Sequence, residues 1–175
     1  MPVRAFACLV LALAALAVPG IASAARSEPE DVDAIRRVVE AFRTSIIDHD
    51  RAAFMGLFFS GVPGEVTWQF ANDDARMARI RKDKPEARKA RHLPEVNHVA
   101  FIDAIVASRK TSEEVFSNID IDTDGEIGSV AFDYEFLSDG KQTNWGREMW
   151  QLVRTEDGWK IISVIWSIHD PATAG

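Results

Sequence analysis

Two histidines and three aromatic residues are the side chains of this sequence best suited to chemistry on a small molecule. His98 precedes a predicted helix, and His169 ends the predicted last strand, where a side chain can reach the mouth of a domain. An imidazole exchanges its proton near neutral pH, so either could act as an acid or base or orient a ligand. Trp68, Tyr134 and Trp150 offer flat apolar walls, although core packing is the alternative for each tryptophan. We expect these five residues to border a ligand pocket; the catalytic residue is unassigned, with His169 the candidate.

The sequence pattern indicates no pair of carboxylates suited to acid–base catalysis. A carboxylate in a dry pocket would have its pKa raised toward neutrality, which suits it to proton transfer. Asp133 lies within a predicted strand but alternates with Phe132 and Tyr134, as does Glu135. If the aromatic residues face the core, both carboxylates lie on the outer face of the sheet.

No metal or cofactor site is predicted. The spacing of Asp120, Asp122, Asp124 and Gly125 begins like a calcium-binding loop, but the twelfth position of that loop is Ala131 instead of a bidentate glutamate. The flanking residues have the periodicity of strands, so a hairpin turn is favoured. The four histidines show no spacing that would bring two of them to one metal.

The first 24 residues have the features of a cleavable signal peptide. Arg4 provides the positive region, residues 5–18 form an apolar run, and Ala22-Ser23-Ala24 is a small-x-small cleavage site. The apolar run is short for a membrane-spanning helix, the alternative being an uncleaved anchor. Cys8 is the only cysteine and lies in the leader, so the mature chain has no thiol and no disulfide. We expect a periplasmic or secreted protein without a stable membrane anchor.

Charge is distributed unevenly along the chain. The net charge is −7, and removal of the one positive charge of the leader makes it −8. Between Arg76 and His92, eight Lys and Arg residues stand against Asp83 and Glu86, a net charge of +6. An acidic body with one basic segment argues against nucleic-acid binding. This segment is expected to be exposed and mobile, as a lid or a docking site for an anionic partner.

Helical patterns dominate the first part of the mature chain. Ser27-Glu28-Pro29-Glu30 reads as a capping box that opens a long amphipathic helix, and Asp50 can cap a shorter helix through Phe59. A short strand follows at residues 66–70. Residues 73–91, interrupted by Pro85, form either a broken exposed helix or a mobile loop. A further amphipathic helix starts after Pro94 and runs through Val106.

From Ser112 the hydrophobic period changes from 3.6 to 2. Val115, Ser117, Ile119 and Ile121 alternate with polar neighbours in the first of four predicted strands. Asp-Gly turns at residues 124–125, 139–140 and 157–158 join these strands into an antiparallel meander. Helices followed by a sheet predict an α+β fold.

Two segments carry a resemblance to a known superfamily. Residues 50–58 are similar to an Asp-led second helix ending in Leu-Phe, and residues 150–154 with 157–161 resemble a closing hairpin. Over residues 31–169 the chain resembles the nuclear transport factor 2-like superfamily, in particular its SnoaL-like, polyketide-cyclase-like bacterial members. The resemblance implies a cone-shaped, cystatin-like α+β fold in which helices pack on a curved, mostly antiparallel sheet around an apolar pocket.

On this basis residues 25–175 form a single domain with a basic insertion at about 73–92. The candidate partners are a small apolar ligand and a second copy bound through the sheet. Because no acid–base pair stands out, the expected function is an exported small-molecule-binding or accessory domain with an apolar pocket and no assignable catalysis. The alternative is a metal-independent acid–base enzyme of the isomerase, dehydratase or hydrolase type acting on a small apolar substrate. A carboxylate or histidine that points into the cone with a perturbed pKa would favour the enzyme.

We predict that the mature protein begins at Ala25 or Arg26, because the small-x-small site ends at Ala24. N-terminal sequencing or the intact mass of periplasmic material measures this directly. Recovery of the full-length chain in the membrane fraction would contradict it.

Overall fold

The computed structural model describes residues 27–171; the expected signal peptide and its cleavage site lie outside this range. The elements, in chain order, are α1 (Pro29–Ile47), α2 (Arg51–Met55), β1 (Thr67–Asn72), α3 (Asp74–Asp83), α4 (His98–Ala107), β2 (Ser112–Thr123), β3 (Ile127–Ser138), β4 (Lys141–Thr155) and β5 (Gly158–Ile168). No helix in this range combines the length and hydrophobicity needed to cross a membrane.

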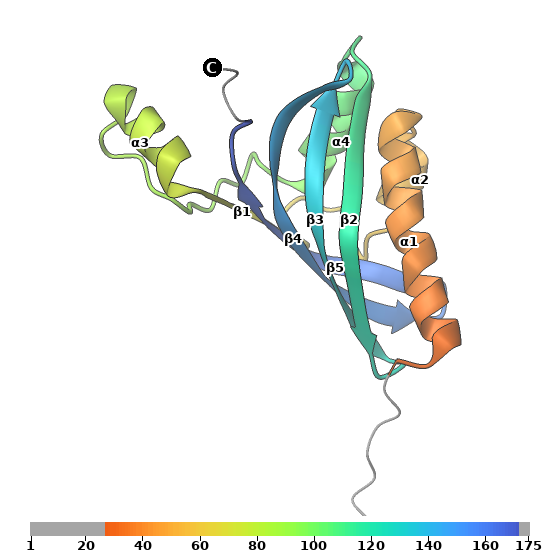
Figure 1. Ribbon diagram of the computed structural model, residues 1–175. Coiled ribbons are helices and arrows are strands. Elements are labelled where there is room, and N and C mark those ends of the chain that lie inside the picture. Colours follow the sequence, from red (N-terminus) through yellow and green to blue (C-terminus); the bar gives the residue numbers. More distant parts are fainter. Residues whose placement is uncertain (1–26, 172–175) are drawn as a thin grey trace, which may run out of the picture.

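A single five-stranded sheet with the strand order β1-β5-β4-β3-β2 forms the frame of the domain. The predicted meander of β2 to β5 is antiparallel throughout, and β1 adds to its edge parallel to β5. The three Asp-Gly turns are present, and Gly125, Gly140 and Gly158 have the positive φ angles that these turns require. Figure 1 shows the sheet as strongly curved and not closed into a barrel. The predicted α+β class is confirmed.

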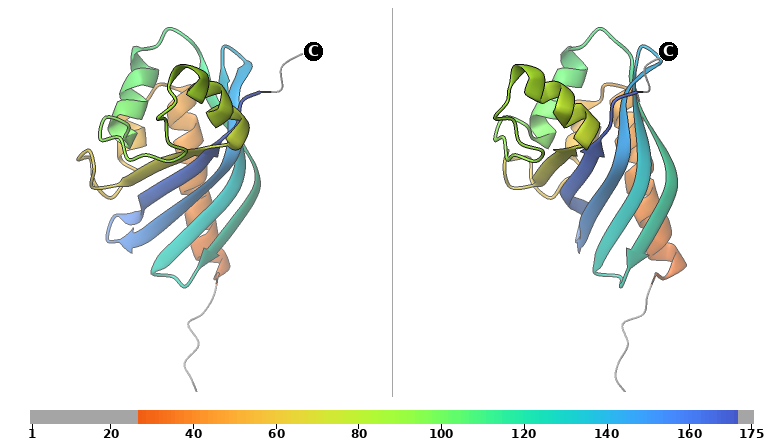
Figure 2. Two further views of the ribbon diagram at one scale, coloured as in Figure 1. Left: turned by 90° about the vertical axis from the view of Figure 1, so that its left-hand side faces the viewer. Right: turned by 60° about the vertical axis from the view of Figure 1, so that its left-hand side comes forward.

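The long helix α1 covers the inner face of this curved sheet. Its apolar stripe buries Ile35, Val39, Phe42 and Ile46. The ring of Phe42 lies 4.8 Å from the ring of Trp150 on β4, centroid to centroid, so helix and sheet share one aromatic core. The views in Figure 2 place α1 behind the sheet and α3 in front of it, so the two helices lie on opposite sides.

The predicted capping box at the start of α1 is wrong. Glu28 is the N-cap residue and makes no capping hydrogen bond with its side chain. Ser27 has a positive φ angle, and its hydroxyl donates to a carboxylate oxygen of Asp122 at 3.2 Å. The start of the helix is therefore held by the β2–β3 hairpin. For α2 the predicted cap is present, because the Asp50 side chain accepts from the amide of Ala53. The helix is shorter than predicted and ends at Met55 instead of Phe59.

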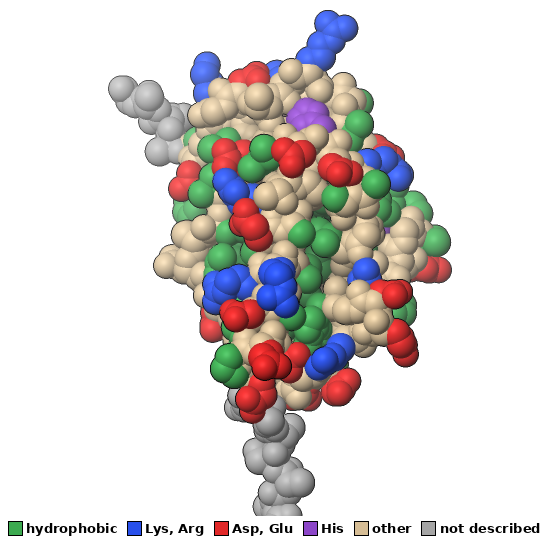
Figure 3. Space-filling model, turned by 90° about the vertical axis from the view of Figure 1, so that its right-hand side faces the viewer, with side chains coloured by type: hydrophobic (Ala, Val, Ile, Leu, Met, Phe, Trp, Pro, Cys, Tyr) green, Lys and Arg blue, Asp and Glu red, His purple; other side chains and the backbone are tan. Residues whose placement is uncertain are grey.

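The outer face of α1 carries charges of both signs. Figure 3 shows Lys and Arg side chains interspersed with Asp and Glu on this side of the molecule. This face is consequently a solvated surface without a field of one sign.

The basic segment is helical in its first part and irregular in its second part. The first part is α3, which buries Met77 and begins at the capping carboxylate of Asp73. The helix ends at Asp83, just before Pro85, and irregular chain continues to α4. Arg76 and Arg79 both pair with Asp170 beyond the end of β5, which ties α3 to the sheet. The remaining basic side chains are mostly exposed.

A bulge in β2 reverses which side chains face the core. The pairing with β3 shifts by one residue between Ser117 and Asp120, and Asn118 has a φ angle of 53°. The sequence pattern placed Val115, Ser117, Ile119 and Ile121 on one face of the strand. Before the bulge, however, the structure turns Glu114 and Phe116 inward and leaves Val115 exposed. A single alternating pattern therefore fails to describe the whole strand.

Limited trypsin digestion is expected to cleave first after Arg88, Lys89 or Arg91. These residues are exposed and lie in irregular chain, so local opening costs little free energy. Arg154 and Lys160, in paired strands, serve as internal controls. Mass spectrometry of the first fragments identifies the sites, and initial cleavage within the sheet would contradict the prediction.

Candidate functional site

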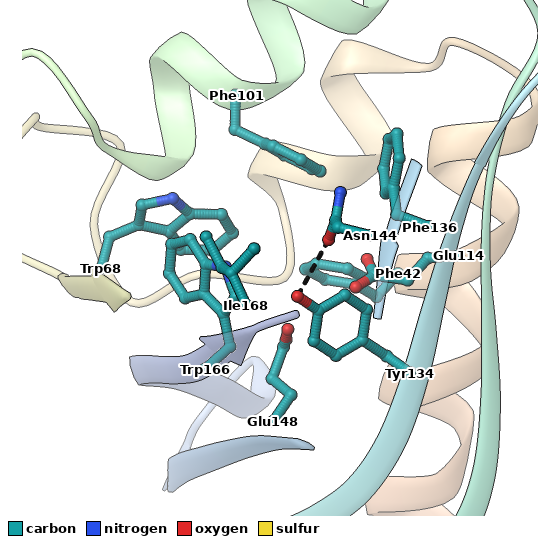
Figure 4. A pocket seen from close by; sticks show the side chains of 10 residues that line it. All are labelled: Phe42, Trp68, Phe101, Glu114, Tyr134, Phe136, Asn144, Glu148, Trp166 and Ile168. Atoms are coloured by element: carbon teal, nitrogen blue, oxygen red, sulfur yellow. Dashed lines mark hydrogen bonds between the residues drawn. The ribbon is translucent and has the colours of Figure 1, made fainter. Parts of the chain in front are cut away.

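A cavity of about 170 Å³ opens between the inner face of the sheet and the helices. All five strands, α1 and α4 contribute to its wall (Figure 4), which is formed by Phe42, Trp68, Phe101, Glu114, Tyr134, Phe136, Asn144, Glu148, Trp166 and Ile168. Six of these ten side chains are apolar. The four polar ones come from β2, β3 and β4, so the cavity has an apolar side and a polar side.

Glu148 is one of two carboxyl groups buried in this wall. It is 4% exposed and lies on β4 in phase with Trp150 and Leu152, which are both buried. The indole Nε1–H of Trp150 donates a hydrogen bond to Oε1 of Glu148. Burial raises the pKa of Glu148 to about 8, and the hydrogen bond from Trp150 opposes this shift.

Glu114 is the second buried carboxyl group, also 4% exposed. The bulge in β2 turns its side chain into the cavity, and no hydrogen bond joins that side chain to the described part of the chain. Burial raises its pKa well above the usual range, and the negative charge of Glu148 raises it further. The two carboxyls therefore titrate as a coupled pair that retains at least one proton at neutral pH.

Tyr134 completes the polar side. Its hydroxyl lies 2.9 Å from Oδ1 of Asn144 and 2.9 Å from the carbonyl oxygen of Ser167, and its single proton can be donated to either. Burial raises the pKa of Tyr134, so the phenol stays protonated at neutral pH.

A glycine makes room for this arrangement. Gly146 pairs with Tyr134 across β3 and β4, and a Cβ at this position would lie 2.0 Å from the carbonyl oxygen of Ser167. The absence of a side chain lets that carbonyl lie close enough to accept from the Tyr134 hydroxyl.

The structure brings together some of the residues that the sequence predicted for the pocket. Trp68 and Tyr134 line the cavity. Trp150 is 1% exposed and does not line the cavity, but its indole donates a hydrogen bond to the lining residue Glu148. Glu114 and Glu148 were missed.

His98 does not border the cavity as expected. It is fully buried beside the ring of Phe58, and its Nε2 lies 2.9 Å from the carbonyl oxygen of Ser60. Burial lowers its pKa, so the imidazole is neutral and helps join α4 to the loop after α2. The helix is capped by Asn97, whose side chain accepts from the amide of Ala100.

His169 also lies outside the cavity wall. Its Nδ1 is 2.9 Å from a carboxylate oxygen of Asp73, and its ring stacks on the exposed Trp145. Ile168, the preceding residue, lines the cavity, and alternation along the strand turns His169 the other way. The candidate catalytic histidine is therefore a contact between the end of β5 and the start of α3.

A sequence signal was available for one of the two glutamates. Glu148, Trp150 and Leu152 recur with period 2, so a strand that buries the tryptophan and leucine also turns the glutamate inward. Glu114 had no such signal, because the bulge changes the alternation after it.

Metal ligands are not gathered in the described part of the chain: residues 27–171 contain no group of three or more His, Cys, Asp or Glu side chains placed to hold one ion. The polar groups that the cavity wall presents are two carboxyls, the phenol of Tyr134 and the amide of Asn144.

Comparison with known proteins supports the fold. No protein-family model and no curated protein matches this sequence. Solved structures do resemble it, including an NTF2-like protein with a cystatin-like fold from Novosphingobium aromaticivorans, 15% identical with a TM-score of 0.54, covering 83% of this chain and 86% of that one.

Two further solved structures are similar to this chain in fold. An NTF2-like protein from Pseudomonas putida is 9% identical, with a TM-score of 0.57 and coverage of 83% of this chain and 92% of that one. A candidate dehydratase of the NTF2-like family from Streptomyces avermitilis is 16% identical, with a TM-score of 0.56 and coverage of 82% and 100%. The chain thus has the predicted nuclear transport factor 2-like, cystatin-like fold.

We predict that the pair makes the protein less stable as the pH rises. Glu148 has a pKa near 4.5 when unfolded and about 8 when folded, so between these values the folded state binds more protons than the unfolded state. The free energy of unfolding must then fall with pH in this window, by about 1.4 kcal/mol per pH unit for one full proton. Glu148→Gln should reduce this slope, as measured by urea unfolding at pH 5, 7 and 9.

Glu113→Gln is the matched control for this experiment. Glu113 is adjacent to Glu114 but pairs with Arg43 and is partly exposed. Its replacement should leave the slope as in the wild type, whereas equal slopes in wild type and Glu148→Gln would contradict the burial of a protonated pair.

Proposed function

We propose that this chain is an acid–base enzyme that transfers protons on a small, mainly apolar molecule through the carboxyl pair Glu114–Glu148. The observation that carries the proposal is an unpartnered, buried carboxyl beside a second buried carboxyl at the wall of an open apolar cavity. Burying an unpaired carboxylate costs several kcal/mol, so such a pair in a cavity is a candidate functional site. Strongly perturbed carboxyls in a cavity are typical of catalytic sites.

The size of the cavity favours a substrate built around one ring. Its volume of about 170 Å³ compares with an engineered apolar cavity of about 150 Å³ that holds benzene. Aromatic side chains from β1, β5 and α4, namely Trp68, Trp166 and Phe101, would contact the apolar body of the ligand.

A carboxyl pair that shares one proton can act as base and acid in the same step. The ionised member removes a proton from a carbon, and the protonated member gives its proton to an oxygen of the substrate. Dehydration and isomerisation both need this combination. The candidate dehydratase with the same fold is in keeping with the first of these reactions, as an analogy at the level of the fold alone.

The second candidate function is ligand binding without catalysis, as an exported binding or accessory domain. The predominantly aromatic wall favours it, because such a wall holds an apolar ligand whether or not the carboxyls react. The two functions differ in what the carboxyl pair does to a bound molecule.

We predict that the protein accelerates loss of water from 3-hydroxycyclohexanone and exchange of the α-hydrogens of cyclohexanone in D₂O. Ultraviolet absorbance of the enone and NMR follow the two reactions. Glu148→Gln and Glu114→Gln should each lower the rate at least a hundredfold, since general acid–base catalysis contributes about 10²–10⁴-fold. The rate should rise with pH as the first carboxyl ionises and fall once the second loses its proton.

Glu113→Gln again serves as the control and should retain the wild-type rate, because Glu113 lies outside the cavity wall. If the Glu113→Gln control were as slow as the two cavity variants, the proposal that the carboxyl pair catalyses the reaction would be rejected. Saturable binding of cyclohexanone with no acceleration by the wild type would favour the binding domain instead.

A further inference from the structure

We propose that Trp150 is a positioning residue, whose indole N–H holds the negative charge of the carboxyl pair on Glu148 and leaves the shared proton on Glu114. The placement of the charge is a property of the free protein, and its use in catalysis rests on the proposed function above. The proposal would make Glu148 the base and Glu114 the acid.

The indole is held rigidly in the orientation that this role needs. Trp150 follows Glu148 by two residues on the same face of β4, and its Nε1–H donates to Oε1 of that carboxyl. Its ring lies 4.8 Å from Phe42 and 5.1 Å from Phe132, in the latter case nearly perpendicular. An indole N–H can only donate, and a carboxylate accepts more strongly than a carboxylic acid. The contact therefore stabilises the ionised form of Glu148.

Glu114 has no comparable donor. Within residues 27–171 no hydrogen bond is made to its side chain, although it is as deeply buried as Glu148. Two carboxyls with the same burial thus differ by one hydrogen bond, and that difference decides which of them ionises first.

The other charged and titratable groups around the pair do not reverse this order. Tyr134 on β3 stays protonated and gives its hydrogen bond to Asn144 or Ser167. Arg76 on α3 acts electrostatically on Tyr134, but its guanidinium is bound to Asn72 and Asp170. From α1 and α4 the cavity wall receives only phenylalanines, which carry no charge.

This assignment gives the proton transfers a direction. With Oε1 of Glu148 occupied by the indole, Oε2 is the oxygen that accepts the substrate proton. In a dehydration the substrate C–H bond breaks and its proton goes to Glu148, the electron pair forms the C=C bond, and the C–O bond breaks as Glu114 protonates the departing hydroxyl to water. Glu148 then holds the proton and Glu114 the charge, and transfer of one proton from Glu148 to Glu114, directly or through solvent, restores the starting state.

The test is an NMR titration of the full-length mature protein with ¹³C-labelled glutamate carboxyls, in the absence of any ligand. In the wild type Glu148 should titrate at lower pH than Glu114. Trp150→Phe removes the donor and keeps an aromatic ring, and it should raise the midpoint of Glu148 by at least one pH unit, bringing it close to that of Glu114. Trp159→Phe, at a buried tryptophan outside the cavity wall, should leave both midpoints unchanged. An unchanged Glu148 midpoint in Trp150→Phe would overturn the proposal.

A second measurement keeps the test decisive if Trp150→Phe does not fold. In wild-type protein labelled with ¹⁵N, the indole N–H resonance of Trp150 should shift with the same midpoint as Glu148, and Glu148→Gln should abolish that shift. An indole resonance insensitive to pH would overturn the proposal. Because no substrate is present, these results stand whether or not the protein proves to be an enzyme, and a catalyst with equal carboxyl midpoints would reject the role of Trp150 alone.

Discussion

Removing two carboxyl groups from water within one cavity is the physical constraint on which the rest of this site depends. Glu114 and Glu148 each lose nearly all contact with solvent, and within residues 27–171 neither forms an ion pair with a cationic side chain. Low polarity and mutual repulsion both favour the neutral form, so the pair keeps a proton that the same residues would lose at a surface. Packing of the aromatic core around Phe42 contributes free energy of folding that offsets the cost of this burial.

The curved sheet is what allows such a pair to form. Neighbouring strands present their inward side chains to a shared space, so residues distant in sequence meet on β2, β3 and β4. Gly146 leaves room for the backbone carbonyl of Ser167, which accepts a hydrogen bond from the Tyr134 hydroxyl beside the pair. The fold itself is shared by proteins of different descriptions, so the chemistry proposed for this chain depends on these few side chains and not on the architecture.

Local periodicity predicted most of the architecture. The stripe of α1, the strand pattern of β3 and the Asp-Gly turns each depend on neighbours close in sequence, and each is present. Trp68 and Tyr134 were expected at the cavity because aromatic side chains suit the wall of an apolar pocket, and both line it. His169 and Ser27 were misplaced because their partners, Asp73 and Asp122, are about 95 residues away. Contacts between residues so far apart in sequence produce no periodic pattern from which they could be predicted.

The orientation of Glu114 could not be predicted from the sequence for a different reason. The β-bulge at Asn118, four residues later in β2, decides which face of the sheet its side chain occupies. Without the extra residue at Asn118, continuous pairing with β3 would turn Glu114 outward or would turn the second half of the strand, with Ile119 and Ile121, away from the core. Deletion of one residue in this exposed stretch of β2 would therefore either remove half of the carboxyl pair or turn Ile119 and Ile121 out of the core, with every cavity residue unsubstituted. Along an evolutionary lineage, this site can be gained or lost through a single codon insertion or deletion, an event that comparison of cavity residues alone would not detect.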